Sequence, residues 1–206
     1  MWIRKEKGLV LLLLLIVASQ ATFGIDEDDP GFFIGSSAFM LMNLNFADDN
    51  PPNFYQINFG LEISDTDVIS LELKTWRYLR PLGIPYGPSL NDPRQNYPGF
   101  IRDYGFALTY QRFIWEDAFL AIHAMNALQE YNDPNGVVIQ RGYMLFITSR
   151  AGYQFSFFGD RFFIEPSIAA TWWPIRTNVP REFQIAEEGW NRFFLAEPGL
   201  HFGFRF

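Results

Sequence analysis

Apolar and polar residues alternate along eight separate segments of this chain, and this period of two constrains the fold more than any other feature. At the end of the chain, Leu200, Phe202, Phe204 and Phe206 fall on one face, and the positions between them hold other residue types. Such alternation predicts strands with one apolar and one polar face. The eight segments are Gly31–Asn45, Phe54–Ile63, Val68–Leu79, Gly99–Phe113, Ala118–Tyr131, Gln140–Phe157, Phe162–Trp173 and Arg192–Phe206.

The connections between these segments alternate between long and short. Short turns are expected at 64–67, 115–117 and 158–161, and the longest loops at Arg80–Pro98 and Pro174–Asn191. An up-and-down barrel inserted into a membrane from one side has tight turns at one end and longer loops at the other. The pattern therefore predicts an antiparallel meander with both termini at the short-turn end.

The apolar faces are unusually aromatic, and no apolar helix accounts for them. Aromatic residues make up 18% of the chain, with 23 Phe, and many stand near segment ends, as in the aromatic girdles of membrane barrels. A membrane helix needs about 20 apolar residues, and no stretch after the N-terminal region is that long. A chain without such a stretch can lie within a bilayer only as a closed barrel, because every backbone polar group needs a partner.

The N-terminus has the pattern of a secretory signal. Arg4, Lys5 and Lys7 precede the apolar run Gly8–Ala18, and small residues lead to a predicted cleavage site near Ala21. An uncleaved signal anchor is the alternative. Residues 1–21 are thus expected to be a signal peptide for the Sec route, and residues 22–206 one barrel domain. The chain has no cysteine, which excludes a lipidated Cys, and its net charge of −7 argues against nucleic acid as a partner.

The export signal, the alternating segments and the terminal Phe206 together resemble small bacterial outer-membrane β-barrels of the OmpX, OmpW and OmpA-barrel type. The resemblance implies an all-β fold, an eight-stranded antiparallel up-and-down transmembrane β-barrel, in the bacterial outer membrane. It also implies contact with outer-membrane lipid and lipopolysaccharide. Phe206 is expected to act as the assembly signal that the outer-membrane assembly machinery recognises.

Eight strands enclose a space that side chains roughly fill, so the inward polar faces predict a packed polar core rather than an aqueous pore. Buried charges need partners, and Arg150 is expected to pair with Glu165 on the neighbouring strand. A structural network is the main prediction, and a proton or ion path is the alternative. The predicted interior network consists of Glu62, Glu72, Lys74, Asp103, Arg150, Glu165, Glu197 and His201.

Pro166 and Pro198 stand within two predicted strands, each directly after a glutamate. Proline inside a sheet marks a bulge or an edge because it donates no ladder hydrogen bond. The two Glu-Pro elements therefore predict a shared bulge. The alternative is a paired-carboxylate site of Glu165 and Glu197 near His201.

No catalytic, metal-binding or cofactor-binding motif is found in the sequence, so no enzyme, metal or cofactor is predicted. The predicted function is a structural or surface-interaction role carried by the extracellular loops, with an unidentified surface partner. One alternative is a conduit for small hydrophobic molecules. A second is an outer-membrane lipid-modifying enzyme or a soluble lipocalin-like binder.

Overall fold

The computed structural model describes residues 31–42, 54–81 and 96–206. The predicted signal peptide, 1–21, and most of the predicted loop 80–98 lie outside the described residues. The elements, in chain order, are β1 (Phe32–Ser37), α2 (Ala38–Met42), β2 (Phe54–Glu62), β3 (Asp67–Tyr78), β4 (Phe100–Trp115), β5 (Ala118–Asn132), β6 (Val138–Tyr153), β7 (Phe155–Phe157), β8 (Phe162–Thr177), α3 (Arg181–Glu187) and β9 (Phe193–Arg205).

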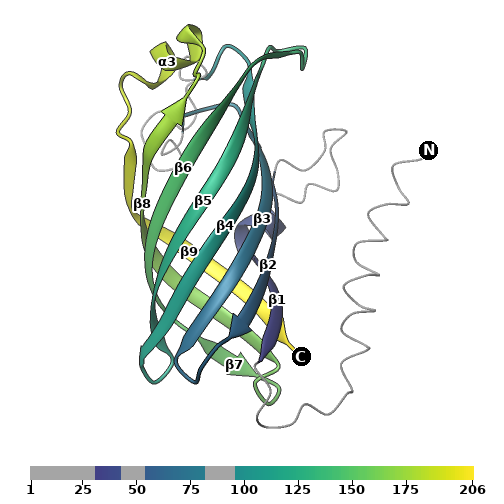
Figure 1. Cartoon of the computed structure of the whole chain (residues 1–206), viewed down its shortest axis with the longest axis vertical. Coiled ribbons are helices and arrows are strands. Elements are labelled where there is room, and N and C mark those ends of the chain that lie inside the picture. The colour runs from purple at the N-terminus through teal and green to yellow at the C-terminus, as the bar shows by residue number, and fades with distance from the viewer. Residues whose placement is uncertain (1–30, 43–53, 82–95) are drawn as a thin grey trace, which may run out of the picture.

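The strands form one antiparallel sheet that closes on itself. Each strand pairs with the next in the chain, and β9 returns to pair with β1. Because β6 and β7 pair with β8 in succession, they act as one strand, and the ring has eight strands. The predicted all-β, up-and-down architecture is confirmed, and Figure 1 shows the strands tilted around the barrel. No helix among the described residues is long and apolar enough to cross a membrane.

The two ends of the barrel differ. We call the end with the tight turns and the C-terminus the turn end, and the end with α3 the loop end (Figure 1). At the turn end, residues with positive φ allow the chain to reverse within a few residues: Glu116 (47°), Phe158 (56°), Gly159 (65°) and Asp160 (63°). The loop end carries the connection from β8 to β9, which contains α3.

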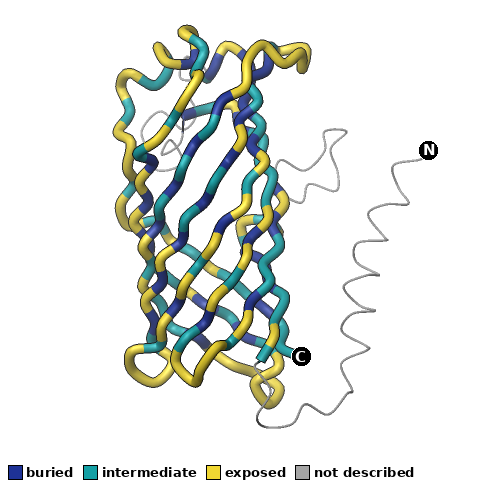
Figure 2. Tube along the Cα trace, viewed as in Figure 1, coloured by how far each residue is buried: buried dark blue, intermediate teal, exposed yellow. Residues whose placement is uncertain are grey.

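The alternation of the sequence becomes an alternation of exposure along each strand (Figure 2). On β4, Leu108 is 63% exposed, whereas its neighbour Ala107 is fully buried. The outward positions of the other strands are likewise large and apolar. Exposed examples from the other strands include Phe32, Tyr55, Leu61, Ile69, Leu71, Leu73, Leu120, Ile122, Leu128, Ile139, Phe155, Ile168, Trp172, Leu195 and Leu200.

The first strand is shorter than the sequence predicted. The prediction was a strand over Gly31–Asn45, but β1 ends at Ser37 and α2 follows at once. Ala38–Met42 is AFMLM, which lacks a polar–apolar alternation and contains four strong helix formers. Residues 43–45 lie outside the described part of the chain.

Pro166 and Pro198 both lie where the regular hydrogen bonding between two neighbouring strands is interrupted. Gln154, where β6 gives way to β7, lies opposite the Glu165–Pro166 step of β8, and Pro166 has no N–H to donate to the ladder. Near Pro198 the register of β8 and β9 shifts, and the extra residue Ala196 has a φ of 60°. The bulge on β9 agrees with the prediction, but the two irregularities lie on opposite edges of β8 and are not one shared bulge.

Candidate functional site

Hydrogen-bonded charges link several strands inside the barrel near the turn end. Arg205 donates from Nε to Glu62 Oε1 at 2.5 Å and from one terminal nitrogen to Gln154 Oε1, also at 2.5 Å. Gln154 Nε2 donates to Glu165 Oε1 at 2.9 Å, and Gln111 Nε2 donates to the same oxygen at 2.8 Å. These bonds tie β2, β4, β8 and β9 to the β6–β7 junction, as expected for a structural network.

A second group of polar side chains lies further toward the middle of the barrel. Glu72 is 6% exposed, accepts a hydrogen bond from Gln56 Nε2 at 2.9 Å and lies 3.4 Å from His123 Nε2. Lys74, on the same strand, lies 5.4 Å from the centre of the Phe146 ring. The lysine therefore rests on an aromatic face, a contact that the sequence analysis did not predict.

The predicted ion pair between Arg150 and Glu165 is not formed: no salt bridge within 4.0 Å joins them in the described structure. The Glu165 Oε1 atom instead binds the amides of Gln111 and Gln154. Arg150 interacts electrostatically with Glu72, Glu165 and Glu197, while its buried Nε has no hydrogen-bond partner among the described residues. Two glutamine amides thus bind the Glu165 carboxylate, which was expected to pair with the Arg150 guanidinium.

Glu165, Glu197 and His201 do not form a hydrogen-bonded carboxylate site. Glu197 accepts a hydrogen bond from Thr171 Oγ1 at 2.8 Å, so the two carboxylates bind different partners. His201 lies opposite Glu165 in the β8–β9 register, but its buried Nδ1 has no partner among the described residues. Glu165 therefore belongs to the hydrogen-bonded group near the turn end, whereas Glu197 binds Thr171 of β8.

The loop-end half of the interior is different, because aromatic and sulfur-containing side chains dominate it. One buried group contains Met125, Met144, Phe146 and Trp173, with Ala107. Another contains Tyr78, Tyr97, Ile101, Tyr131 and Phe183. The prediction of a packed polar core is therefore only partly confirmed in this half, where the buried Asp103 and Gln129 lie among these apolar side chains. The inward positions near the loop ends of β3 and β5 are Trp76, Tyr78 and Tyr131, which interrupt the alternation of polar and apolar residues.

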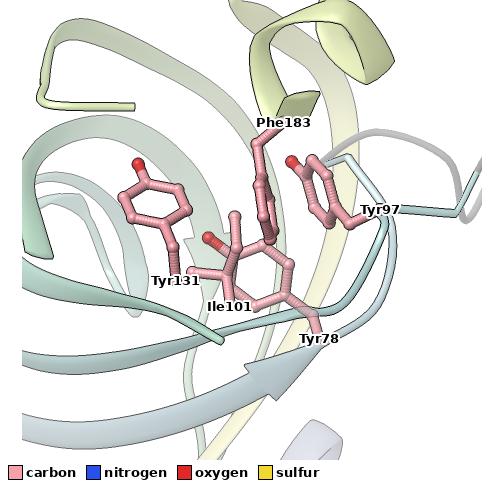
Figure 3. Packing of buried hydrophobic residues seen from close by; sticks show 5 residues of the cluster. All are labelled: Tyr78, Tyr97, Ile101, Tyr131 and Phe183. Atoms are coloured by element: carbon pink, nitrogen blue, oxygen red, sulfur yellow. The ribbon is translucent and has the colours of Figure 1, made fainter. Parts of the chain in front are cut away.

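Phe183 closes the loop end of the barrel. It is 1% exposed and points down from α3 between two tyrosine rings, above Ile101 and Tyr78 (Figure 3). Its ring centre lies 5.0 Å from that of Tyr97, in a stacked arrangement, and 5.2 Å from that of Tyr131, edge to face. We call these five residues the aromatic lid. The connection that carries α3 is thus packed onto the barrel rather than extended from it.

Arg176 ties the aromatic lid to the interior. Its guanidinium pairs with Glu187 of α3, donates from Nε to Gln129 Oε1 at 3.2 Å, and donates to the Tyr131 hydroxyl at 3.5 Å. Gln129 in turn donates to Asp103 Oδ1 at 3.0 Å. A continuous polar chain therefore runs from the barrel interior to α3. From the sequence, Arg176 was expected in a loop, whereas it lies in β8, and its contacts were not predicted.

Glu187 also accepts a hydrogen bond from the Tyr97 hydroxyl, which brings the end of the β3–β4 connection onto α3. Burial and the negative charge of Glu187 hold the pKa of Tyr97 well above its usual range. Tyr97 therefore stays protonated at physiological pH and remains a hydrogen-bond donor to the carboxylate.

A pocket of about 360 Å³ opens beside the aromatic lid, between the end of β8, α3 and the residues that precede β9. We call it the mouth pocket. It is lined by Trp173 and Trp190, by Arg176 and Glu187, and by amide side chains that include Asn191. The backbone N–H of Trp173 donates to the Arg192 carbonyl at 3.0 Å, which fixes the two strand ends that border the pocket. The predicted loop Pro174–Asn191 thus contributes much of this pocket.

At the turn end, Phe206 packs against the first strand. Its ring centre lies 6.0 Å from that of Phe32 and 5.5 Å from that of Phe204, and its N–H donates to the Phe32 carbonyl at 2.9 Å. The residue predicted as an assembly signal therefore lies at the β1–β9 closure of the ring.

Comparison with protein-family models, curated proteins and solved structures found no significant match to the chain. Among the described residues, no group of three or more His, Cys, Asp or Glu is arranged to hold a metal ion.

Proposed function

We propose that this chain is an integral outer-membrane β-barrel of the small eight-stranded type, with a structural core and a binding surface at the loop end. The observation that carries the proposal is the outward face of the barrel. Leu108, Leu128 and Leu195 are each 63–64% exposed there, on strands β4, β5 and β9. Large apolar side chains exposed around a whole ring are costly in water and are favourable against lipid.

The closed ring supports the same proposal from the backbone. In a bilayer, an unpaired N–H or C=O costs several kcal/mol, and a barrel satisfies these groups between strands. A soluble lipocalin-like barrel would place its apolar residues inside and its polar residues outside. Here the turn-end interior holds Glu62, Glu165 and Arg205, and the outside holds the large apolar side chains, which supports the membrane proposal over the soluble one.

The loop end is proposed as the interaction surface because the two other regions leave little room for a ligand. The turns at the opposite end are tight, and the interior is packed with hydrogen-bonded or aromatic side chains. The aromatic lid and Arg176 hold α3 rigidly, so the mouth pocket is a preformed feature. No catalytic role is proposed for it.

Cell fractionation tests the membrane proposal. The chain expressed with its N-terminal region should be recovered in the outer membrane, and its gel mobility should change on heating as the barrel unfolds. A matched variant without residues 1–21 should stay out of that membrane. Recovery of the full chain in the soluble periplasm would contradict the proposal.

A conduit for small hydrophobic molecules is a second candidate, favoured by the pairing of β9. Phe33–Ser37 of β1 pair with Arg205–His201, but residues 193–200 of β9 pair only with β8 among the described residues. Residues 54–57 of β2 likewise pair only with β3 there, and the ring of Phe39, in α2, lies 4.8 Å from that of Phe54. Among the described residues, α2 rather than a strand contacts both β2 and β9 here, and such a break in strand pairing beside aromatic side chains is where an apolar molecule could pass sideways.

Transfer of a fluorescent fatty acid into proteoliposomes tests this second candidate. A conduit predicts transfer faster than in protein-free liposomes and a changed rate in Phe39→Ala. The control is Phe158→Ala, which removes a side chain that is 83% exposed at the turn end. A wild-type rate equal to that of protein-free liposomes would exclude the conduit.

A further inference from the structure

We propose that the mouth pocket binds a neutral saccharide, with one sugar ring held against Trp190. This inference rests on the proposed function, because it names the ligand class of the loop-end surface. Saccharides can reach this end of an outer-membrane barrel from two sources, as free sugars outside the cell or as the sugars of lipopolysaccharide. The chemistry of recognition is the same for both.

The charges around the pocket favour a neutral ligand. Two arginines, Arg176 and Arg192, are matched by two glutamates, Glu187 and Glu188. Arg176 and Glu187 pair with each other, and their side chains are 7% and 21% exposed. The lining therefore carries no net charge, and its most buried cation is already neutralised. Glu188 pairs with Arg181 at 3.7 Å, so Arg192 forms no ion pair among the described residues, but its side chain is exposed. A single exposed arginine holds an anion weakly because water screens its charge.

The polar groups suit a ligand with many hydroxyls. Asn178, Gln184 and Asn191 line the pocket, and a side-chain amide both donates and accepts hydrogen bonds. Gln184 Nε2 donates to the Val179 carbonyl at 2.7 Å, which leaves its carbonyl oxygen as an acceptor. Adjacent sugar hydroxyls likewise donate and accept, so amides can bind them in either direction.

The indole rings supply the apolar part of such a site. The flat C–H face of a sugar ring packs on an aromatic ring, while its hydroxyls point outward to polar partners. Trp173 is 6% exposed and packs on Phe146, with 5.7 Å between ring centres, so it forms a rigid floor. Trp190 is half-buried and belongs to the connection after α3, and its backbone N–H donates to the Glu187 carbonyl at 2.9 Å. Trp190 is therefore the ring that a ligand can reach.

Arg176 and Glu187 hold this arrangement in place. Glu187 binds both Arg176 of β8 and Tyr97 of the β3–β4 connection, and Phe183 anchors the same helix in the aromatic lid. The pocket wall is thus fixed before a ligand arrives, which reduces the entropy lost on binding. These residues are positioning residues, and the test leaves them unchanged.

Glycan binding by the detergent-solubilised full chain tests the proposal in two arms. The first arm uses an array of immobilised neutral mono- and disaccharides, and the second uses the neutral outer-core oligosaccharide of lipopolysaccharide, freed of lipid, acidic sugars and phosphate. Trp190→Ala should weaken binding about tenfold, and Asn191→Ala about fivefold. The matched control is Trp115→Ala, which removes an indole that is 70% exposed at the turn end and should leave binding unchanged.

Each result decides the proposal. Binding in the first arm identifies free saccharide as the source, and binding in the second identifies lipopolysaccharide sugar; either one supports a saccharide site if both pocket variants weaken it. No binding in either arm overturns it, as does binding that both variants retain, or binding that inorganic phosphate abolishes. All variants must first show heat-modifiable mobility and outer-membrane recovery. Failure of the wild-type chain there counts against the membrane proposal, while intact recovery of the wild-type chain without binding counts against the saccharide alone.

Discussion

Replacing Arg176 with alanine should detach α3 from the barrel. The substitution leaves Glu187 without its cation and removes the hydrogen bonds to Gln129 and Tyr131. Because the two charged side chains are 7% and 21% exposed, water replaces these bonds poorly. Breaking a buried pair by removing one partner costs 3–5 kcal/mol in general, and the partial exposure of Glu187 places this pair at about 3 kcal/mol.

The chain offers a matched control in a second arginine–glutamate pair. Arg141 lies 2.9 Å from Glu130, but its side chain is 75% exposed, so Arg141→Ala should cost about 0.5 kcal/mol. Arg176→Lys should fall between these values, because lysine keeps the charge but lacks the planar fork that reaches several acceptors.

Two measurements check this prediction. Equilibrium urea unfolding of the refolded barrel gives the free energy of unfolding, and limited trypsin digestion reports on α3 through cleavage after Arg181. Arg176→Ala should speed cleavage there, whereas Arg141→Ala should not. A difference between the two alanine variants below about 1 kcal/mol, with equal cleavage rates, would refute the argument that the buried pair holds α3.

Three further predictions concern other parts of the barrel. Deleting Phe206 should lower the amount of barrel in the outer membrane more than it lowers the unfolding free energy of refolded protein; normal outer-membrane levels would contradict a role in assembly. Arg205→Met should lower the free energy of unfolding by about 2 kcal/mol because it breaks several hydrogen bonds, and Arg150→Met should lower it less. Urea unfolding measures both losses, and a larger loss for Arg150→Met would contradict this account. Backbone N–H groups, chiefly that of Val137, lower the pKa of Asp133, so its stabilisation of this turn is present above the ordinary Asp pKa and is lost as pH falls through the lower folded value. The Val137 amide resonance should titrate with a midpoint below about 3.9, and a midpoint at or above that value would contradict the hydrogen bond.

The repeating parts of the fold could be predicted from the sequence because a strand has a fixed period. Tyr55 and Leu61 on β2, and Leu108 on β4, face outward as their alternation indicated. The turns were also predictable, since polar and glycine residues separate the strands. The break at Ser37 was not, because the helix preference of AFMLM competes with strand pairing, and the sequence does not show which prevails.

The interior could be predicted only in part. The alternation of residues showed which charged side chains face inward. It did not show which residues they bind, because that depends on the register between neighbouring strands. Gln111 and Gln154 both donate to the same oxygen of Glu165, and neither was singled out from the sequence. Arg176 was missed because Pro174 suggested that β8 had ended, whereas the strand continues to Thr177. An irregular connection such as the one containing α3 has no period from which its contacts could be inferred.

Lipid contact of the outward face is the central claim, and site-directed spin labelling in lipid bilayers tests it most directly. The chain has no cysteine, so single-cysteine variants label one position each. Leu108→Cys places the label outward, and Thr109→Cys places it on the next, inward position of β4. The Leu108 label should be relaxed by oxygen, which concentrates in lipid, and the Thr109 label by neither oxygen nor a water-soluble nickel chelate. Relaxation of the Leu108 label by the nickel chelate would mean that the outward face lies in water, and would contradict the membrane barrel.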